Sequence, residues 1–360
     1  MRLLICAGGT GGGVYPALAV HGVLTSKVPD VDTLWVGGEG GMEASLVKRQ
    51  GIPFRSIPAA GVHGVSLLRL PRNLAQLGRG ILAARRILND FKPDVLFFTG
   101  GYVAVPVALA GRSIPSLLYV PDIEPGMALK SLARSADVIA VTTEQSQKFF
   151  NKQVYETGYP LRPDLVLWDR QTAHQHLKIS GELPVLLMFG GSKGARSINL
   201  AVQHHLYALL AKFEVIHISG ETDWLVVKNM RDRLPAELTP RYHAMPYLHE
   251  MGAALASADL VVSRAGASSL GEYPLFALPA ILVPYPHAWR YQKVNADYLT
   301  RRGAAIILED HRLIDELPVT LNVLLENPNK LKAMRAAMFE LSHPRAAEKI
   351  ASALIQLAGE

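Results

Sequence analysis

The chain has 360 residues, enough for two domains that each bury a core. Hydrophobic residues make up 49% and charged residues 19%, which excludes an intrinsically disordered chain. The net charge of +6 favours nucleic acid, an anionic membrane surface or phosphorylated substrates as partners. Nucleic acid is disfavoured, because no RNA- or DNA-binding motif is present and the few aromatic residues do not alternate with basic ones.

The single cysteine, Cys6, excludes a disulfide framework and fits a reducing compartment such as the cytosol. It lies in an apolar run, where a buried core residue is expected rather than a nucleophile. That run is too short for a signal peptide. The longest apolar run, residues 95–111, is interrupted by glycines and Pro106 and is too short to span a bilayer. We therefore expect a cytoplasmic protein.

The first half of the chain alternates apolar strands with amphipathic helices. Residues 2–7 predict a buried strand, followed by a glycine run at 8–13 and a helix from about 16 to 24, which is how a doubly wound nucleotide-binding domain begins. The glycine spacing does not give the dinucleotide fingerprint, and the next strand ends in glycines instead of an acidic residue, so a dehydrogenase is disfavoured. The further strands are expected at residues 33–36, 54–57, 94–98, 116–120, 138–141 and 154–157.

Residues 67–91 predict a helix with an apolar side bordered by arginines at positions 69, 72, 79, 85 and 86. Such a helix either contacts an anionic membrane surface or packs on the core with a solvated basic face. The sequence leaves both interpretations open.

The second half begins like the first, after a boundary rich in proline and glycine at residues 158–163. A strand at 183–189, a glycine loop at 190–194 and a helix at 195–210 repeat the pattern. Later strands are expected at residues 215–219, 242–245, 260–262, 280–283 and 305–308, and a last helix at about 344–357. The chain is therefore predicted to contain two similar α/β domains.

Residues 263–298 are predicted to form a nucleotide-sugar site. The turn at Gly266 and the helix that begins at Ala267 and Ser268 aim backbone N–H groups at one point, which suits a phosphate. Glu272 lies one turn further on and suits two vicinal ribose hydroxyls. Gln292 and Asn295 share a helix face and suit sugar hydroxyls. The alternatives are a solvated helix acid for Glu272 and a surface polar residue for Gln292.

This segment resembles the donor-binding pattern of the MurG family of N-acetylglucosaminyltransferases. The matching residues are Arg264, Gly266-Ala267, Glu272, Leu278-Pro279-Ala280 and Gln292-Lys293-Val294-Asn295-Ala296. The resemblance implies an α/β fold of the GT-B type, with two facing Rossmann-like domains, parallel sheets and an interdomain cleft. It places the acceptor domain at residues 1–161, with the C-terminal helix at about 344–360 packed back on it, and the UDP-sugar donor domain at 162–343.

The resemblance also implies further site residues. Tyr247 and Leu248 are expected to hold the uracil, and Gly191, Ser192 and Arg162 to lie near the donor phosphates. The acceptor side matches the family less closely: Gly13 stands where the family has histidine, and Val120-Pro121-Asp122 replaces its Glu-x-Asn. We hypothesise that Asp122 is the general base and that Tyr102 contacts the acceptor. The expected acceptor-side residues are Thr10, Gly11, Gly12, Gly13, Gly101 and Tyr102.

No metal and no cofactor are expected, because helix N-termini can stabilise a leaving diphosphate and the one Asp-x-Asp, residues 30–32, lies far from the other motifs. The resemblance implies inverting transfer of N-acetylglucosamine from UDP-N-acetylglucosamine (UDP-GlcNAc) to a polyprenyl-pyrophosphate-linked acceptor at the inner face of the plasma membrane. Three alternatives stay open: a relative with another glycolipid or small-molecule acceptor, a UDP-GlcNAc 2-epimerase, and a non-catalytic UDP-sugar-binding protein.

Overall fold

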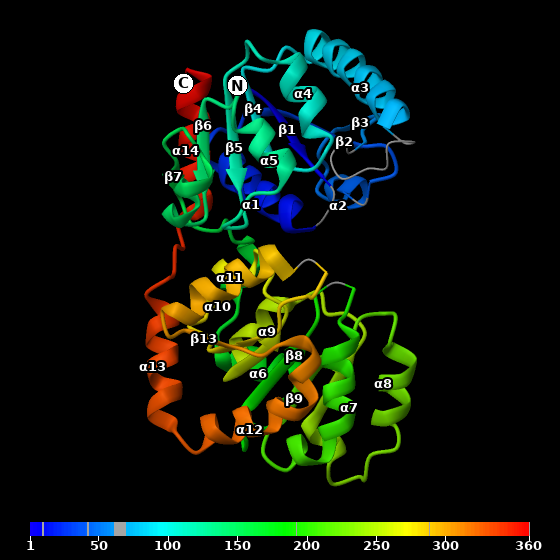
Figure 1. Cartoon of the computed structure of the whole chain (residues 1–360), viewed down its shortest axis with the longest axis vertical. Helices are drawn as coiled ribbons and strands as arrows, with labels where there is room; N and C mark the ends of the chain where they lie inside the picture. The colour runs from blue at the N-terminus through cyan, green and yellow to red at the C-terminus, as the bar shows by residue number, and fades with distance from the viewer. Residues whose placement is uncertain (9–10, 42, 61–69, 192, 288, 360) are drawn as a thin grey trace. The chain divides into compact units, whose positions relative to one another are not determined.

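The computed structural model describes residues 1–8, 11–41, 43–60, 70–191, 193–287 and 289–359. The chain forms two compact units, and the boundary lies one residue from the expected one (Figure 1). Unit 1 contains Met1–Arg162 and His343–Glu360, and unit 2 contains Pro163–Ser342.

In the described part of unit 1, seven parallel strands form one sheet in the order β3-β2-β1-β4-β5-β6-β7. Their bounds agree closely with the predicted strands: β1 Arg2–Ala7, β2 Asp32–Gly38, β3 Phe54–Ile57, β4 Val95–Gly100, β5 Ser116–Val120, β6 Val138–Val141 and β7 Tyr155–Glu156. The central strands β1, β4, β5 and β6 are apolar almost throughout because both faces of a parallel sheet are covered by helices. Cys6 has no exposed surface, which confirms its predicted place in the core.

Helices cover both faces of this sheet. Alternate β1 residues face opposite sides, with Leu4 in one core cluster and Ile5 in the other. The clusters include residues of α3, α4 and α5 on one face and of α1, α2 and α14 on the other. The bounds are α1 Gly11–Lys27, α2 Glu43–Arg49, α3 Leu70–Phe91, α4 Ala104–Ala110, α5 Met127–Leu132, the 3-10 helix η1 Glu144–Phe149 and α14 Ala346–Ala358.

The C-terminal helix α14 belongs to unit 1. Its buried residues Ile350, Ala351 and Leu354 pack with Val14 and Val20 of α1. Burial of each large aliphatic side chain stabilises the fold by roughly 1.5–3 kcal/mol, so this contact anchors the end of the chain.

The start of α1 differs from the prediction. The helix begins at Gly11, five residues before Pro16, although glycine is a poor helix former. Val14 and Ala17 are fully buried in the first turns, so tertiary packing outweighs the low propensity of the glycines.

In the described part of unit 2, the parallel strand order is β10-β9-β8-β11-β12-β13. Residues of α7, α8, α12 and α13 join one core cluster on a face of this sheet. The strands are β8 Val185–Phe189, β9 Glu214–Ile218, β10 Tyr242–Met245, β11 Leu260–Ser263, β12 Ala280–Leu282 and β13 Ala305–Ile307. The helices are η2 Pro163–Leu167, α6 Arg170–Leu177, α7 Arg196–Leu210, α8 Trp224–Arg231, η3 Thr239–Arg241, α9 Met251–Ser257, α10 Ser269–Leu275, α11 Trp289–Arg301, η4 Asp310–Arg312, α12 Leu313–Leu325 and α13 Pro328–Phe339.

Each sheet reverses its strand order at one point, between β1 and β4 in unit 1 and between β8 and β11 in unit 2. Ligands of doubly wound sheets bind at the carboxyl ends of the strands beside such a switch point. The glycine loops after β1 and β8 and the turns at Gly101 and Gly266 follow strands at these points, and the other predicted site residues follow neighbouring strands or lie in the segment between the units. The topology therefore predicts that the site of each unit lies at the carboxyl ends of its strands, beside the switch point.

Candidate functional site

The loop after β8 and the loop after β11 lie at the switch point of unit 2. Gly194 in the first loop has φ +77°, and a Cβ there would lie 2.1 Å from the carbonyl oxygen of Ser219. Only glycine fits this close approach. Gly191 is exposed on the same loop, whereas Ser192 lies outside the described residues.

Arg264 fixes the end of β11. Its guanidinium donates to the Val283 carbonyl at 3.0 Å and to the Ser197 hydroxyl at 2.9 Å, and it pairs with the carboxylate of Asp310. These partners come from the end of β12, from α7 and from η4. Arg264 therefore connects the end of β11 to these three segments and stabilises the predicted phosphate loop that follows it. The sequence pattern contained Arg264, but its partners are distant in the chain and were missed.

The predicted phosphate loop leads directly into α10. Gly266 accepts hydrogen bonds at its carbonyl from the Ser269 amide at 3.0 Å and the Ser269 hydroxyl at 2.6 Å. Ala267 is buried, and Ser268 is partly exposed at the helix start. Glu272 is partly exposed in the first turn of α10, which has seven residues.

Gln292 and Asn295 lie on one face of α11, as predicted, and both bind the loops beside them. Gln292 accepts a hydrogen bond at Oε1 from the Tyr285 amide at 2.8 Å. Asn295 has no exposed surface and donates from Nδ2 to the Ala265 carbonyl at 3.2 Å. In this structure Asn295 thus holds the loop as a positioning residue, and its direct contact with the sugar stays a prediction.

Tyr247 and Leu248 follow β10 at the carboxyl edge of the unit 2 sheet. Tyr247 is exposed and packs edge-on against His249, with ring centroids 4.8 Å apart. Leu248 is half-buried. Arg162, the last residue of unit 1's first segment, places its guanidinium carbon 5.0 Å from the ring centroid of Tyr15, a residue of α1.

The loops after β1 and β4 meet at the switch point of unit 1. Gly13 accepts a hydrogen bond at its carbonyl from the Thr99 hydroxyl at 2.7 Å. Gly101 has φ +86°, and a Cβ there would lie 2.8 Å from the carbonyl oxygen of Gly8, so glycine is required. Tyr102, which follows, is 52% exposed. Gly11 and Gly12 start α1, and Thr10 lies outside the described residues.

Asp122 lies on the loop after β5, in the same unit, and is partly exposed. Burial raises the pKa of Tyr119 well above its ordinary value; the hydrogen bond between Tyr119 and Thr142 opposes the shift, and the charge of Asp122 adds to it. The loop holds a second carboxylate that the sequence analysis missed. Glu124 is 5% exposed, and its Oε1 lies 3.9 Å from the Lys130 ammonium.

No group of three or more histidine, cysteine, aspartate or glutamate side chains suited to a metal ion occurs among the described residues. Within those residues, no helix is both long and apolar enough to cross a membrane.

These features define a two-unit α/β protein with nucleotide-type switch points in both halves. The model of the glycosyltransferase family 28 N-terminal domain matches residues 3–141, and that of the family 28 C-terminal domain matches residues 185–350. The chain belongs to glycosyltransferase family 28.

Curated relatives match over nearly the full chain. The UDP-N-acetylglucosamine–N-acetylmuramyl-(pentapeptide) pyrophosphoryl-undecaprenol N-acetylglucosamine transferase of Roseiflexus sp. is 39% identical, with 98% of this chain and 94% of the relative covered. The protein of the same name from Desulforudis audaxviator is 38% identical, with 100% and 99% covered.

Among solved structures, MurG of Acinetobacter baumannii matches with a TM-score of 0.80 at 27% identity, with 99% of each chain covered. The expected family and the GT-B fold class are thereby confirmed.

Proposed function

We propose that this chain transfers N-acetylglucosamine from UDP-GlcNAc to a polyprenyl-pyrophosphate-linked sugar acceptor, with inversion at the sugar carbon. The relatives named above are transferases of this kind and match this chain from end to end. The observation that supports the proposal best is the placement of Gly191, Gly266 and Glu272 at the β8/β11 switch point, with Gln292 of α11 bound to the loop after the neighbouring strand β12. A nucleotide sugar binds such an edge through its phosphates, ribose and sugar hydroxyls.

The donor is held by unit 2. Backbone N–H groups of the loop and turn at Gly266, Ala267 and Ser268 bind the diphosphate, and the Glu272 carboxylate accepts from the ribose hydroxyls. Gln292 donates its amide to the sugar while its oxygen stays on the Tyr285 amide. Tyr247 and Leu248 hold the uracil, and the loop at Gly191 and Ser192 adds to the diphosphate site.

The acceptor is held by unit 1, at the loops that carry Gly11–Gly13, Gly101 and Tyr102. Asp122 removes the proton from the attacking hydroxyl. The acceptor oxygen forms a bond to the anomeric carbon of N-acetylglucosamine while the bond from that carbon to the diphosphate oxygen breaks. UDP leaves with the bonding electron pair, and the N–H groups at the Gly266 loop stabilise its charge.

We further propose that unit 1 contacts an anionic membrane surface through α3. Leu74 is 51% exposed and Leu82 is 59% exposed, and the exposed arginines of the helix lie at positions 72, 79, 85 and 86. Exposed leucines among arginines suit the boundary between lipid head groups and acyl chains. With this contact, the proposal is a cytoplasmic protein that lies at the inner face of the plasma membrane.

The test is a transfer assay with labelled UDP-GlcNAc and a purified undecaprenyl-pyrophosphoryl-N-acetylmuramyl-pentapeptide acceptor. We expect UDP release and a labelled lipid-linked disaccharide with a β-linkage. A labelled product that is an isomerised UDP-sugar, formed without acceptor, would favour a 2-epimerase. Tight UDP-GlcNAc binding with no product in any acceptor pool would favour a non-catalytic binder.

A glycolipid or small-molecule acceptor remains the second candidate function. It is favoured by Gly13 and Asp122, which stand where the family pattern has histidine and asparagine. Turnover of a short-chain glycolipid in preference to the pyrophosphate-linked acceptor, measured as the ratio of kcat/KM values, would support it.

A further inference from the structure

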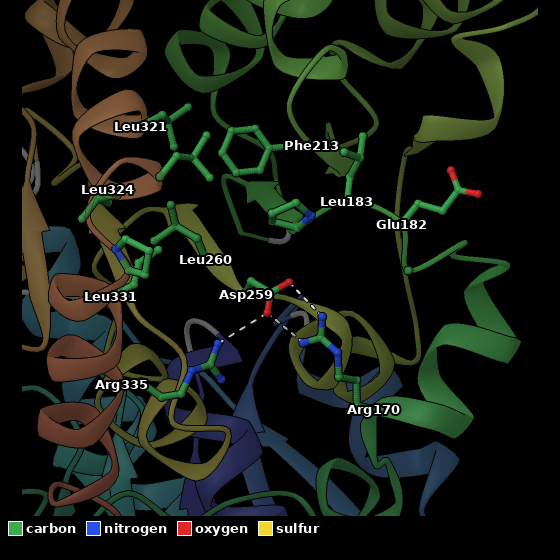
Figure 2. Close-up of a pocket in the computed structure, with 14 residues that line it drawn as sticks. Arg170, Glu182, Leu183, Phe213, Asp259, Leu260, Leu321, Leu324, Leu331 and Arg335 are labelled. Carbon is green, nitrogen blue, oxygen red and sulfur yellow. Dashed lines mark hydrogen bonds and ion pairs between the residues drawn. The ribbon is translucent and has the colours of Figure 1, made fainter.

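A pocket of about 420 Å³ lies at the amino-terminal edge of the unit 2 sheet (Figure 2). Its walls are the segment before β8, the start of β11, and the helices α12 and α13. The predicted donor residues follow the carboxyl ends of the same strands. Since β8 has five residues, the two edges are separated by about 16 Å. The pocket is therefore distinct from the proposed donor site.

One side of the pocket is an ion cluster centred on Asp259. Arg170 donates two hydrogen bonds to its carboxylate, at 2.9 Å and 2.8 Å, and the Val185 amide donates a third at 2.9 Å. Arg335 reaches the same carboxylate from α13, at 3.5 Å (Figure 2). Asp259 is thus already bound closely by Arg170 and Val185, and Arg335 is a second, more distant cation.

Two guanidinium groups share one carboxylate here, so this side of the pocket has an excess of one positive charge. The other acid of the lining, Glu182, is exposed and extends away from Asp259 (Figure 2). Arginine binds carboxylates and phosphates with paired N–H groups. The ion cluster can therefore accept one anionic head group by a small movement of Arg335 away from Asp259.

The opposite side of the pocket is apolar. Its surface is formed mainly by the partly exposed Leu183, Leu325 and Leu331. Behind them lie core side chains that are at most 3% exposed: Phe213, Leu260, Leu321 and Leu324. The volume lies within the range of about 300–1,000 Å³ that small-molecule sites occupy. An apolar body with one acidic end matches both sides at once.

We propose that this pocket binds a small amphipathic anion, a carboxylate or phosphate ester attached to an apolar chain. The acidic head lies on the guanidinium of Arg335, and the chain lies against the partly exposed side chains of Leu183, Leu325 and Leu331. The proposal does not depend on the transferase reaction, because it uses none of the residues placed at the switch points.

The test is isothermal titration calorimetry of the full chain with decanoate and decyl phosphate, below the concentrations at which they aggregate. Decanol and decylamine serve as neutral and cationic controls of the same chain length. We expect saturable one-to-one binding of the anions, binding of decanol weaker by about tenfold or more, and no binding of decylamine. If only one of the two anions binds, the head group is identified as carboxylate or phosphate.

Variants locate the site. Arg335→Gln is expected to weaken decanoate binding by about tenfold or more. Lys332→Gln, which removes a charge from the exposed side of the same helix, is expected to leave it unchanged. Leu331→Trp is expected to abolish binding by filling the pocket, and thermal unfolding checks that each variant is folded.

Two results would overturn the proposal. One is the absence of saturable binding of both anions to the unmodified protein. The other is binding that neither Arg335→Gln nor Leu331→Trp alters, which would place the ligand elsewhere.

Discussion

Asn295 donates a hydrogen bond to the carbonyl oxygen of Ala265, and neither residue has exposed surface. The bond joins helix α11 to the end of β11, where the proposed diphosphate loop begins. A polar contact without access to solvent holds the loop in place. Asn295 differs in this respect from Glu272 and Gln292, which are partly exposed and can contact a ligand.

Replacement of Asn295 by alanine should affect both stability and donor binding. The buried Ala265 carbonyl would lose its partner, which costs about 1–3 kcal/mol in the free energy of unfolding. The loop would also loosen, so we expect a raised KM for UDP-GlcNAc. Urea unfolding and steady-state kinetics measure the two effects, with Asn229→Ala on the exposed surface of α8 as the matched control. Normal stability and normal KM in Asn295→Ala would contradict the positioning role.

Arg264→Lys should impair the donor site although the charge is kept. Lysine cannot reach Val283, Ser197 and Asp310 together, because it lacks the planar fork of arginine. We expect kcat/KM for UDP-GlcNAc to fall by about tenfold or more, the effect of losing a hydrogen bond to a charged group. Arg301→Lys, at the exposed end of α11, is the control. An unchanged kcat/KM in Arg264→Lys would show that the loop keeps its conformation without the hydrogen bonds of Arg264.

Asp122→Asn tests the proposed general base. The change keeps the size of the side chain and removes its basicity, so we expect kcat to fall by about 10²-fold or more, with little change in KM for UDP-GlcNAc. Asp90→Asn, an exposed acid of α3 paired with Arg55, serves as the control.

Glu124→Gln is the variant that decides between the two carboxylates of this loop. If Asp122 is the base, Glu124→Gln lowers the stability of the fold because it removes the ion pair with Lys130. The variant then retains most of the kcat of the unmodified enzyme. A large loss of kcat in Glu124→Gln together with near-normal turnover in Asp122→Asn would transfer the role to Glu124.

Vesicle binding tests the surface of α3. The double variant Leu74→Gln/Leu82→Gln should bind phosphatidylglycerol vesicles about tenfold more weakly or worse, because each exposed leucine contributes roughly 1.5–3 kcal/mol when it enters an apolar phase. Sedimentation with vesicles at low salt measures the affinity. Leu225→Gln, at a 70% exposed leucine of unit 2, should have no effect. Equal binding by the double variant would exclude α3 as the contact.

The stability of the fold should decrease as the pH falls below about 6.5. His217 is fully buried between the Tyr242 hydroxyl at 2.8 Å and the Asn199 amide oxygen at 2.9 Å, and burial lowers its pKa to about 3. The unfolded chain takes up a proton near pH 6.5, whereas the folded chain does not. Each such group lowers the free energy of unfolding by about 1.4 kcal/mol per pH unit in this range. Burial also lowers the pKa of His21, which adds in the same direction.

Urea unfolding between pH 6.5 and 5.0 measures this slope before most carboxylates titrate. In the variant His217→Gln, the free energy of unfolding should depend less steeply on pH, by the contribution of one proton. In His311→Gln, which replaces an exposed histidine, the pH dependence should be unchanged. A slope in His217→Gln equal to that of the unmodified chain would show that His217 does not resist protonation.

Much of the fold was predictable because the central parallel strands are apolar almost throughout, and several of them, such as β1, β4 and β8, run into glycine loops. The start of α1 was not, because three glycines conceal a helix that packing of Val14 and Ala17 stabilises. At the site, spacing predicted that Gln292 and Asn295 share a helix face. Spacing does not indicate what that face contacts, so the burial of Asn295 emerged only from the structure. The partner of Arg264, Asp310, is 46 residues away, beyond any local pattern.

A crystal structure of the chain with UDP-GlcNAc tests the central claim most directly. It should show the ribose hydroxyls within hydrogen-bonding distance of the Glu272 carboxylate and the diphosphate on the amides at Gly266–Ser268. A nucleotide bound away from the carboxyl edge of β8 and β11, or a Glu272 side chain that contacts no part of it, would contradict the proposed donor site and the transfer mechanism built on it.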